Sequence, residues 1–175
     1  MDGHGPITHE AMSTITAPSE YRVEKRRSHA TVTLSSGQSE QGCFFLASSS
    51  TRHDGPERVA DLLNSELGFF PFEIHDARGT RTVLYHRSHV LIVVLAEDEA
   101  SRDPGYNVAT RRLVSVLLSN GHRVSGTVRV YRPEGRDRLS DWTRQPETFR
   151  YLETGETTIV VNLAHIVEVS EVPEP

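Results

Sequence analysis

The chain has 175 residues, of which 36% are hydrophobic and 25% are charged, and its formal net charge is −5 at pH 7 with an isoelectric point near 6.0. This composition is typical of a globular protein with one large or two small domains, and it excludes an intrinsically disordered chain. The negative net charge argues against nucleic-acid binding by the whole molecule, although a local basic face would still permit it.

A single cysteine, Cys43, excludes an internal disulfide framework and a multi-cysteine zinc site. The first residues have neither the basic opening nor the apolar stretch of a signal peptide. No segment approaches the roughly 18 consecutive apolar residues of a membrane span. We therefore expect a cytoplasmic protein that does not enter a membrane and that binds no cofactor.

The first part of the chain reads as a tail followed by a β-rich unit. Residues 1–21 contain scattered Gly, Pro, Ser and Thr without periodicity, which predicts a disordered tail. The first unit is predicted over 22–96. In it, a strand over 30–34 leads to a tight turn at Gly37 and to a second strand that contains Gly42, and a short helix over 56–67 and three further strands follow.

A second unit repeats this order over 111–172, after an acidic linker over 97–110 that contains Pro-Gly. Its first strand leads to Asn120-Gly121, the strongest two-residue hairpin signal, and a short helix is expected over 139–145. Residues 173–175 form a short tail. We therefore predict a mainly β chain of two tandem, Sm-like or SH3-like five-stranded barrels, each with one short helix.

Matching positions of the two units carry the same residue types. The landmarks are Gly37, Gly42, Arg58, Asp61 and His89 in the first unit, and Gly121, Gly126, Arg138, Asp141 and His165 in the second. An Arg and an Asp three residues apart share one face of a helical turn and can pair. We interpret the Arg-Asp pairs and the two histidines as structural, with a catalytic or ligand histidine as the alternative.

The apolar pattern predicts a core in each unit. The expected core residues are Val32, Leu34, Phe44, Phe69, Phe72, Val83, Tyr85, Val90 and Ile92 in the first unit, and Val116, Leu118, Val128, Phe149, Leu152, Ile159, Val161, Ile166 and Val167 in the second.

The hairpin at Asn120-Gly121 and the closing strands over 159–166 resemble the two sequence blocks of Sm-like proteins, the family of the bacterial RNA chaperone Hfq. The resemblance implies ring assembly and uridine recognition. The chain departs from the family in its inserted helical segment and in Asn162-Leu163-Ala164, where the family has a basic-Gly turn. The Arg-x-x-Asp, Phe and His-Ile pattern is also similar to uncharacterised bacterial proteins without an assigned activity.

Metal ligands and nucleophiles are few. The rings of His86 and His89 would lie on opposite faces of an extended chain, and no third ligand is spaced to join them. Cys43 lies in an apolar segment and is interpreted as a small buried hydrophobic residue. No nucleophile elbow, P-loop or Rossmann fingerprint occurs. We therefore expect neither a metal site nor enzymatic activity.

Two groups of residues are candidates for partner binding. Phe69, Phe70 and Phe72, together with exposed strand edges, are expected to contact a protein. The second group is an Arg-rich face of the second unit, formed by Arg123, Arg129, Arg132 and Tyr131.

These residues favour a non-catalytic binding or scaffold protein that acts through protein–protein contacts, and a homo-oligomer is compatible with this function. The alternative is binding of RNA or single-stranded nucleic acid by the Arg-rich face, where phosphate contacts and base stacking would combine.

Overall fold

The computed structural model describes Met1 and residues 25–65, 68–133 and 135–173. The described chain is mainly β, as expected, and has two short α-helices. The predicted tail over 1–21 lies outside the described residues apart from Met1. None of the helices in the described part of the chain has the length and apolar character needed to cross a bilayer.

Each half of the chain contains two strands, a helix and three strands, in the predicted order. The first half consists of β1 (Lys25–Leu34), β2 (Ser39–Ala47), α1 (Val59–Ser65), β3 (Phe69–Asp76), β4 (Gly79–His86) and β5 (Val90–Leu95). The second half consists of β6 (Thr110–Leu118), β7 (Arg123–Val130), α2 (Leu139–Thr143), β8 (Phe149–Glu153), β9 (Thr158–Asn162) and β10 (Ile166–Glu171). Short 3-10 turns lie at η1 (Arg87–His89), η2 (Ala100–Arg102) and η3 (Leu163–His165).

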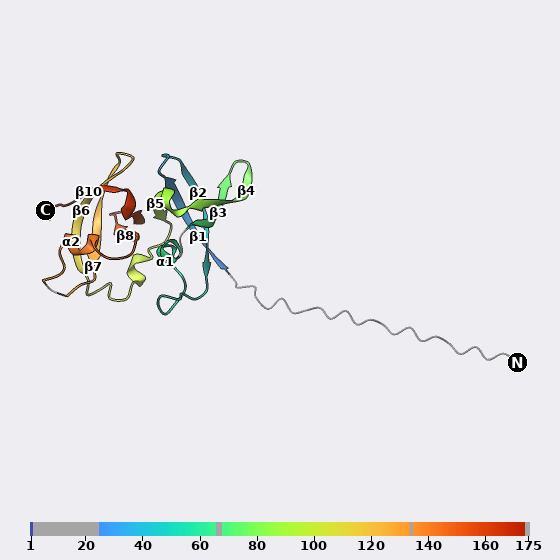
Figure 1. Ribbon diagram of the computed structural model, residues 1–175, viewed down its shortest axis with the longest axis horizontal. Coiled ribbons are helices and arrows are strands. Elements are labelled where there is room, and N and C mark those ends of the chain that lie inside the picture. Colours follow the sequence, from blue (N-terminus) through green and yellow to red (C-terminus); the bar gives the residue numbers. More distant parts are fainter. Residues whose placement is uncertain (2–24, 66–67, 134, 174–175) are drawn as a thin grey trace.

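All ten strands form one antiparallel sheet in the order β10-β6-β7-β8-β9-β5-β1-β2-β3-β4. The strand order is the same in each half, and the halves join where β5 pairs with β9, with Val93 opposite Val160. Figure 1 shows the two halves side by side, each with its helix packed near the sheet. The sheet ends at β4 and β10, so the expected closure of each half into a separate barrel is not observed.

The turns that open each half are the predicted ones. Gly37 and Gly121 adopt φ angles of 87° and 83°, which a residue with a Cβ rarely adopts. Each glycine N–H donates to the carbonyl that closes its turn, that of Leu34 or Leu118, at 2.9 Å. The hairpins β1–β2 and β6–β7 therefore have matching geometry.

The segment between the halves, predicted as a linker, packs against both of them. Glu99 is 1% exposed and accepts a hydrogen bond from the backbone N–H of Val59 at 2.9 Å. Asp98 accepts another from the hydroxyl of Thr158 in the second half at 2.9 Å. Because these carboxylates bond to opposite halves, the segment adds to the contact made by the strands.

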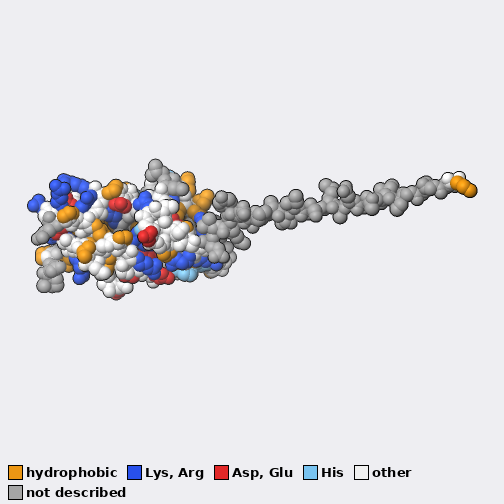
Figure 2. Space-filling model, turned by 90° about the horizontal axis from the view of Figure 1, so that it is seen from below, with side chains coloured by type: hydrophobic (Ala, Val, Ile, Leu, Met, Phe, Trp, Pro, Cys, Tyr) orange, Lys and Arg blue, Asp and Glu red, His pale blue; other side chains and the backbone are white. Residues whose placement is uncertain are grey.

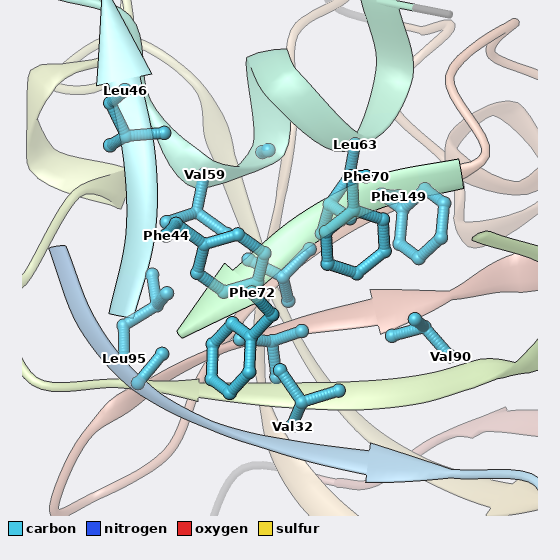
Figure 3. Packing of buried hydrophobic residues seen from close by; sticks show 14 of the residues in the cluster. Val32, Phe44, Leu46, Val59, Leu63, Phe70, Phe72, Val90, Leu95 and Phe149 are labelled. Atoms are coloured by element: carbon cyan, nitrogen blue, oxygen red, sulfur yellow. The ribbon is translucent and has the colours of Figure 1, made fainter. Parts of the chain in front are cut away.

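The hydrophobic core has two parts that share residues across the junction. The part under the first half includes Phe149 and Val160 from the second half, and the part under the second half includes Leu91 from the first. Figure 3 shows Phe149 beside Phe70, within the cluster of phenylalanines that fills the first part. Neither half therefore has a complete core without the other.

The predicted core is largely confirmed, with two corrections. Phe69 and Val167 were expected inside and are exposed. In β3 the inward position belongs to Phe70, because alternate residues of a strand face opposite sides. Val167 lies on β10, which is an outer edge of the sheet and has no second strand to cover it among the described residues.

Glycine is required at two matching positions where strands approach closely. A Cβ added to Gly42 would lie 1.9 Å from the carbonyl oxygen of Glu73, and one added to Gly126 would lie 2.6 Å from that of Glu153. These backbone atoms cannot move aside as a flexible side chain can. The two glycines occupy β2 and β7, the second strand of each half.

We predict that Gly42→Ala lowers the free energy of unfolding by an amount at or above the roughly 1–3 kcal/mol typical of overpacking. The reason is the contact between the added methyl group and the backbone of β3. Gly155→Ala is the matched control, since nothing lies within 4 Å of its added Cβ. Urea denaturation of both variants measures the effect, and equal stability would contradict the close approach of β2 and β3.

Candidate functional site

The two outer strands of the sheet are counterparts of the two strands that meet at the junction. β4 holds the place in the first half that β9 holds in the second, and β10 holds the place of β5. β9 and β5 pair with each other, whereas β4 and β10 each have a strand on one side only within the described chain. An edge strand presents N–H and C=O groups that another strand can bind.

The aromatic residue at the start of β3 is exposed, whereas its counterpart at the start of β8 is buried. Phe69 lies opposite His86 and is 64% exposed, whereas its counterpart Phe149 lies opposite Asn162 and is 4% exposed. Phe149 is covered because it packs into the core of the other half. Phe69 has an edge contact with the ring of His86, at 4.9 Å between centroids.

The edge strands themselves carry two further exposed hydrophobic residues. Leu84 and Val167 are each 65% exposed, whereas their counterparts at the junction, Val160 and Leu91, are fully buried. Leu84 precedes the end of β4 by two residues, as Val160 does in β9, and Val167 and Leu91 are the second residues of β10 and β5. Both outer edges therefore expose side chains of the kind that the junction buries.

Of the phenylalanines predicted to bind a partner, Phe69 alone is accessible. Phe70 and Phe72 are buried, and their rings lie 5.4 Å and 5.0 Å from that of Phe44. Their role in the described structure is to fill the core of the first half, which leaves Phe69 and the adjoining β4 as the candidate protein-binding surface.

Polar contacts hold the junction in register. The side-chain oxygen of Asn64, from α1, accepts hydrogen bonds from the N–H groups of Thr148 and Phe149 at 3.0 and 2.9 Å, and its amide donates to the carbonyl of Phe149 at 2.8 Å. Asn162 donates to the carbonyl of Val90 at 2.8 Å. Asn162 is buried, and a buried amide is costly unless it is bonded, so these contacts favour one alignment of the halves.

The Arg-rich group of the second half is largely neutralised by carboxylates. Arg123 pairs with Glu168 at 3.1 Å, and Arg129 pairs with Glu153 at 2.7 Å while its guanidinium lies 3.4 Å above the ring of Tyr106. Figure 2 shows basic side chains gathered at the end of the molecule formed by the second half, with acidic ones close by. These ion pairs compete with any phosphate contact.

Tyr131 and Arg132 follow the end of β7. The hydroxyl of Tyr131 donates to Asp103 at 3.1 Å, whereas Arg132 is exposed. Of the three arginines predicted to form one basic face, Arg123 and Arg129 therefore have carboxylate partners and Arg132 is exposed.

The recurring histidines lie at matching corners and contact matching serines. Nδ1 of His89 is 3.4 Å from Oγ of Ser35, and Nδ1 of His165 is 2.9 Å from Oγ of Ser119. Nε2 of His165 also lies 2.6 Å from the carbonyl oxygen of Ser88 across the junction. The contacts link the first hairpin of each half to its last strand, in agreement with a structural role.

A cavity lined by both charged and apolar residues lies where α1, α2, β7 and β8 meet. Among the recurring ionisable residues Arg58 and Asp61 line it, whereas Arg138, Asp141, His89 and His165 do not. The described residues of its wall include no Ser, Thr, Cys or Lys. Four side chains that often act as covalent nucleophiles, those of Ser, Thr, Cys and Lys, are therefore missing from the described wall of this cavity.

The Arg58–Asp61 pair at this cavity is joined by a histidine that the sequence did not indicate. Arg58 Nε donates to Asp61 Oδ2 at 2.9 Å, and Nε2 of His53 lies 2.7 Å from the same oxygen. Arg58 also bonds to Asp103. His53 lies in the loop that follows β2, where sequence spacing alone gives no sign of its contact with α1.

The hydrogen bonds of this group shift its titration. Burial alone raises the pKa of Asp61, but the hydrogen bonds from Arg58 and His53 outweigh burial and lower it. The bond to Asp61 in turn raises the pKa of His53. Asp61 is thus held as a carboxylate beside His53, which accepts a proton more readily than an ordinary histidine.

Comparison with protein-family models, with curated proteins and with solved structures finds no match to this chain.

The raised pKa of His53 predicts a pH-dependent contribution to stability. That contribution is fully present below the ordinary histidine pKa of about 6.5 and is lost as the pH rises through the higher value of the folded state. The unfolding free energy of the wild-type protein should therefore fall as the pH rises above about 6.5, and His53→Gln should make this fall less steep. Urea denaturation at several pH values measures the slope. The exposed His122, changed to Gln, is the control, and parallel curves for wild type and His53→Gln would contradict the contact.

Proposed function

We propose that the chain is a non-catalytic binding protein that accepts a β-strand of a partner protein on its β4 edge. The observation that carries the proposal is the difference between Phe69 and Leu84, which are exposed, and their counterparts Phe149 and Val160, which are buried where the halves meet. The junction thus provides, within the same chain, an example of how such an edge is covered.

Strand addition suits the chemistry of this edge. The backbone groups on the outer side of β4 supply hydrogen bonds to any extended segment, and side-chain contacts supply specificity. Phe69 and Leu84 are the anchors, because full burial of a Phe or Leu side chain contributes about 1.5–3 kcal/mol relative to exposure. A partner with an apolar strand like β5 (VLIVVL) would pair with β4 and pack against these two residues, as β5 pairs with β9 at the junction.

A second copy of the chain is the first partner to test. Its β10 is the counterpart of β5 and exposes Val167. The repeated strand order also supports the proposal that the halves are diverged copies of one Sm-like five-stranded unit, for which the resemblance implies ring assembly. Nucleic-acid binding through the Arg-rich group stays a prediction.

We predict that Leu84→Lys abolishes the association, because it places a charge where a partner strand would bury an apolar side chain. Val108→Lys is the matched control, since Val108 is 87% exposed and lies outside every strand. Sedimentation velocity over a range of concentrations measures self-association against the 19.6 kDa monomer. Capture from a native lysate, with and without nuclease, then tests other partners.

Loss of a partner in Leu84→Lys but not in Val108→Lys supports the proposal. Two results would contradict it: a partner bound equally well by Leu84→Lys, or a partner that disappears on nuclease treatment.

A further inference from the structure

Three neighbouring strands of the first half bring four potential metal ligands to one face of the sheet. His29 on β1 lies opposite Cys43 on β2, and Cys43 lies opposite Glu73 on β3. His75 follows Glu73 by two residues and therefore shares its face. Residues far apart in the sequence thus form one row across the sheet.

The distances among Cys43, Glu73 and His75 are those between ligands of one metal ion, and His29 lies beside the sulfur of Cys43 but outside this set. Sγ of Cys43 lies 3.2 Å from Nδ1 of His29 and 3.3 Å from Nε2 of His75, and Oε1 of Glu73 lies 3.4 Å from the same Nε2. Zinc bonds of about 2.0–2.3 Å in a tetrahedron separate neighbouring ligand atoms by roughly 3.3–3.6 Å. The ligand atoms of Cys43, Glu73 and His75 all lie within 4.8 Å of one another.

Glu73 provides independent support for a cation. Its side chain is 9% exposed and the whole residue 7%, yet Oε1 has no hydrogen-bond partner among the described residues. Oε1 and Sγ of Cys43 both approach Nε2 of His75, and one ring nitrogen holds at most one proton. A cation between the three atoms would satisfy them all, whereas a buried carboxylate oxygen without a partner is costly.

Neighbouring side chains orient two of these ligands. Nδ1 of His75 lies 3.3 Å from Oγ1 of Thr80, which leaves Nε2 toward the cluster. Oε2 of Glu73 accepts a hydrogen bond from Arg27 at 3.2 Å, which leaves Oε1 as the ligand atom. Metal ligands are commonly held in this way by a second contact.

The second half shows that the fold does not require these residue types. In its matching row, Leu113 lies opposite Thr127 and Thr127 lies opposite Glu153. The glutamate is kept there, but it pairs with Arg129. The histidines and the cysteine of the first half are therefore additions to a sheet that forms without them.

A nucleophilic cysteine fits the geometry less well. Cys43 is fully buried, and burial followed by the charge of Glu73 raises the pKa of its thiol, whereas a nucleophile needs an open site that stabilises the thiolate. In a Cys-His-carboxylate triad the acid bonds to the far ring nitrogen, but Glu73 and Cys43 share Nε2 of His75. The raised pKa of the thiol does not prevent metal binding, because a metal ion displaces the thiol proton and stabilises the thiolate.

We propose that Cys43, Glu73 and His75 bind one Zn²⁺ ion on β2 and β3, with His29 of β1 as a neighbour of the sulfur ligand. A thiolate, an imidazole and a carboxylate form a donor set that suits zinc, and the two anionic ligands balance its charge. His29 and His75 are exposed, so the ion reaches the site from solvent. The inference departs from the sequence-based expectation of no metal site.

The experiment uses the full chain and ZnCl₂ in competition with a chromophoric chelator. We expect one equivalent of Zn²⁺ in the wild-type protein. His29→Ala and His75→Ala should each bind at least about tenfold more weakly, since changes to residues behind a ligand already cost about 10–100-fold. These exposed histidines are chosen because their loss leaves the core intact, and circular dichroism checks the fold.

His122→Ala is the matched control, because His122 is an exposed histidine in the β6–β7 turn of the other half. Its affinity for Zn²⁺ should equal that of the wild type. Co²⁺ gives a second measurement: a thiolate-to-cobalt charge-transfer band should appear in the wild type and be absent in Cys43→Ser. Zn²⁺ should also raise the melting temperature of the wild type more than that of His75→Ala.

Three results would overturn the proposal. The first is a wild-type protein that takes up no Zn²⁺ in the competition. The second is a Co²⁺ complex without the thiolate band. The third is Zn²⁺ binding that survives His29→Ala and His75→Ala, which would assign it to other residues such as His4 and His9.

Discussion

The pairing of β5 with β9 is the contact on which the rest of this structure depends. It makes one sheet of ten strands from two halves of five, and it positions Phe149 and Val160 in the core of the first half and Leu91 in that of the second. Without it these side chains would be exposed, at a cost of about 1.5–3 kcal/mol for each large one. The halves are therefore parts of one cooperative core.

The same pairing explains why the two ends of the sheet differ from its middle. Each half has two edge strands. The pairing uses β5 of the first half and β9 of the second, and it leaves β4 and β10 with a neighbour on one side only in the described chain. The residues that the junction buries have counterparts near those edges, Phe69, Leu84 and Val167, which no described part of the chain covers. The candidate binding surface is thus a direct consequence of the repeated strand order.

The two halves differ in the polar residues of one matching row. Glu73 and Glu153 occupy equivalent places beside Gly42 and Gly126, where the backbones approach closely. In the second half Arg129 donates to both oxygens of the carboxylate, whereas in the first half Arg27 bonds to one oxygen only and the other lies beside His75, which is within reach of Cys43. A shared backbone therefore holds an ion pair in one half and the proposed zinc site in the other.

The sequence by itself determined the elements of this protein, because they follow from local patterns. The turns at Gly37 and Gly121 require positive φ angles, and alternating apolar residues mark the strands, so the order of elements was predictable. Tertiary structure decided the rest. Two separate barrels and one continuous sheet use the same strands, so the sequence could not distinguish them. The exposure of Phe69 depends on which edge strands of the two halves pair, and this too is decided by the tertiary structure. The row of His29, Cys43, Glu73 and His75 was hidden because strand pairing, and no spacing along the chain, brings those residues together.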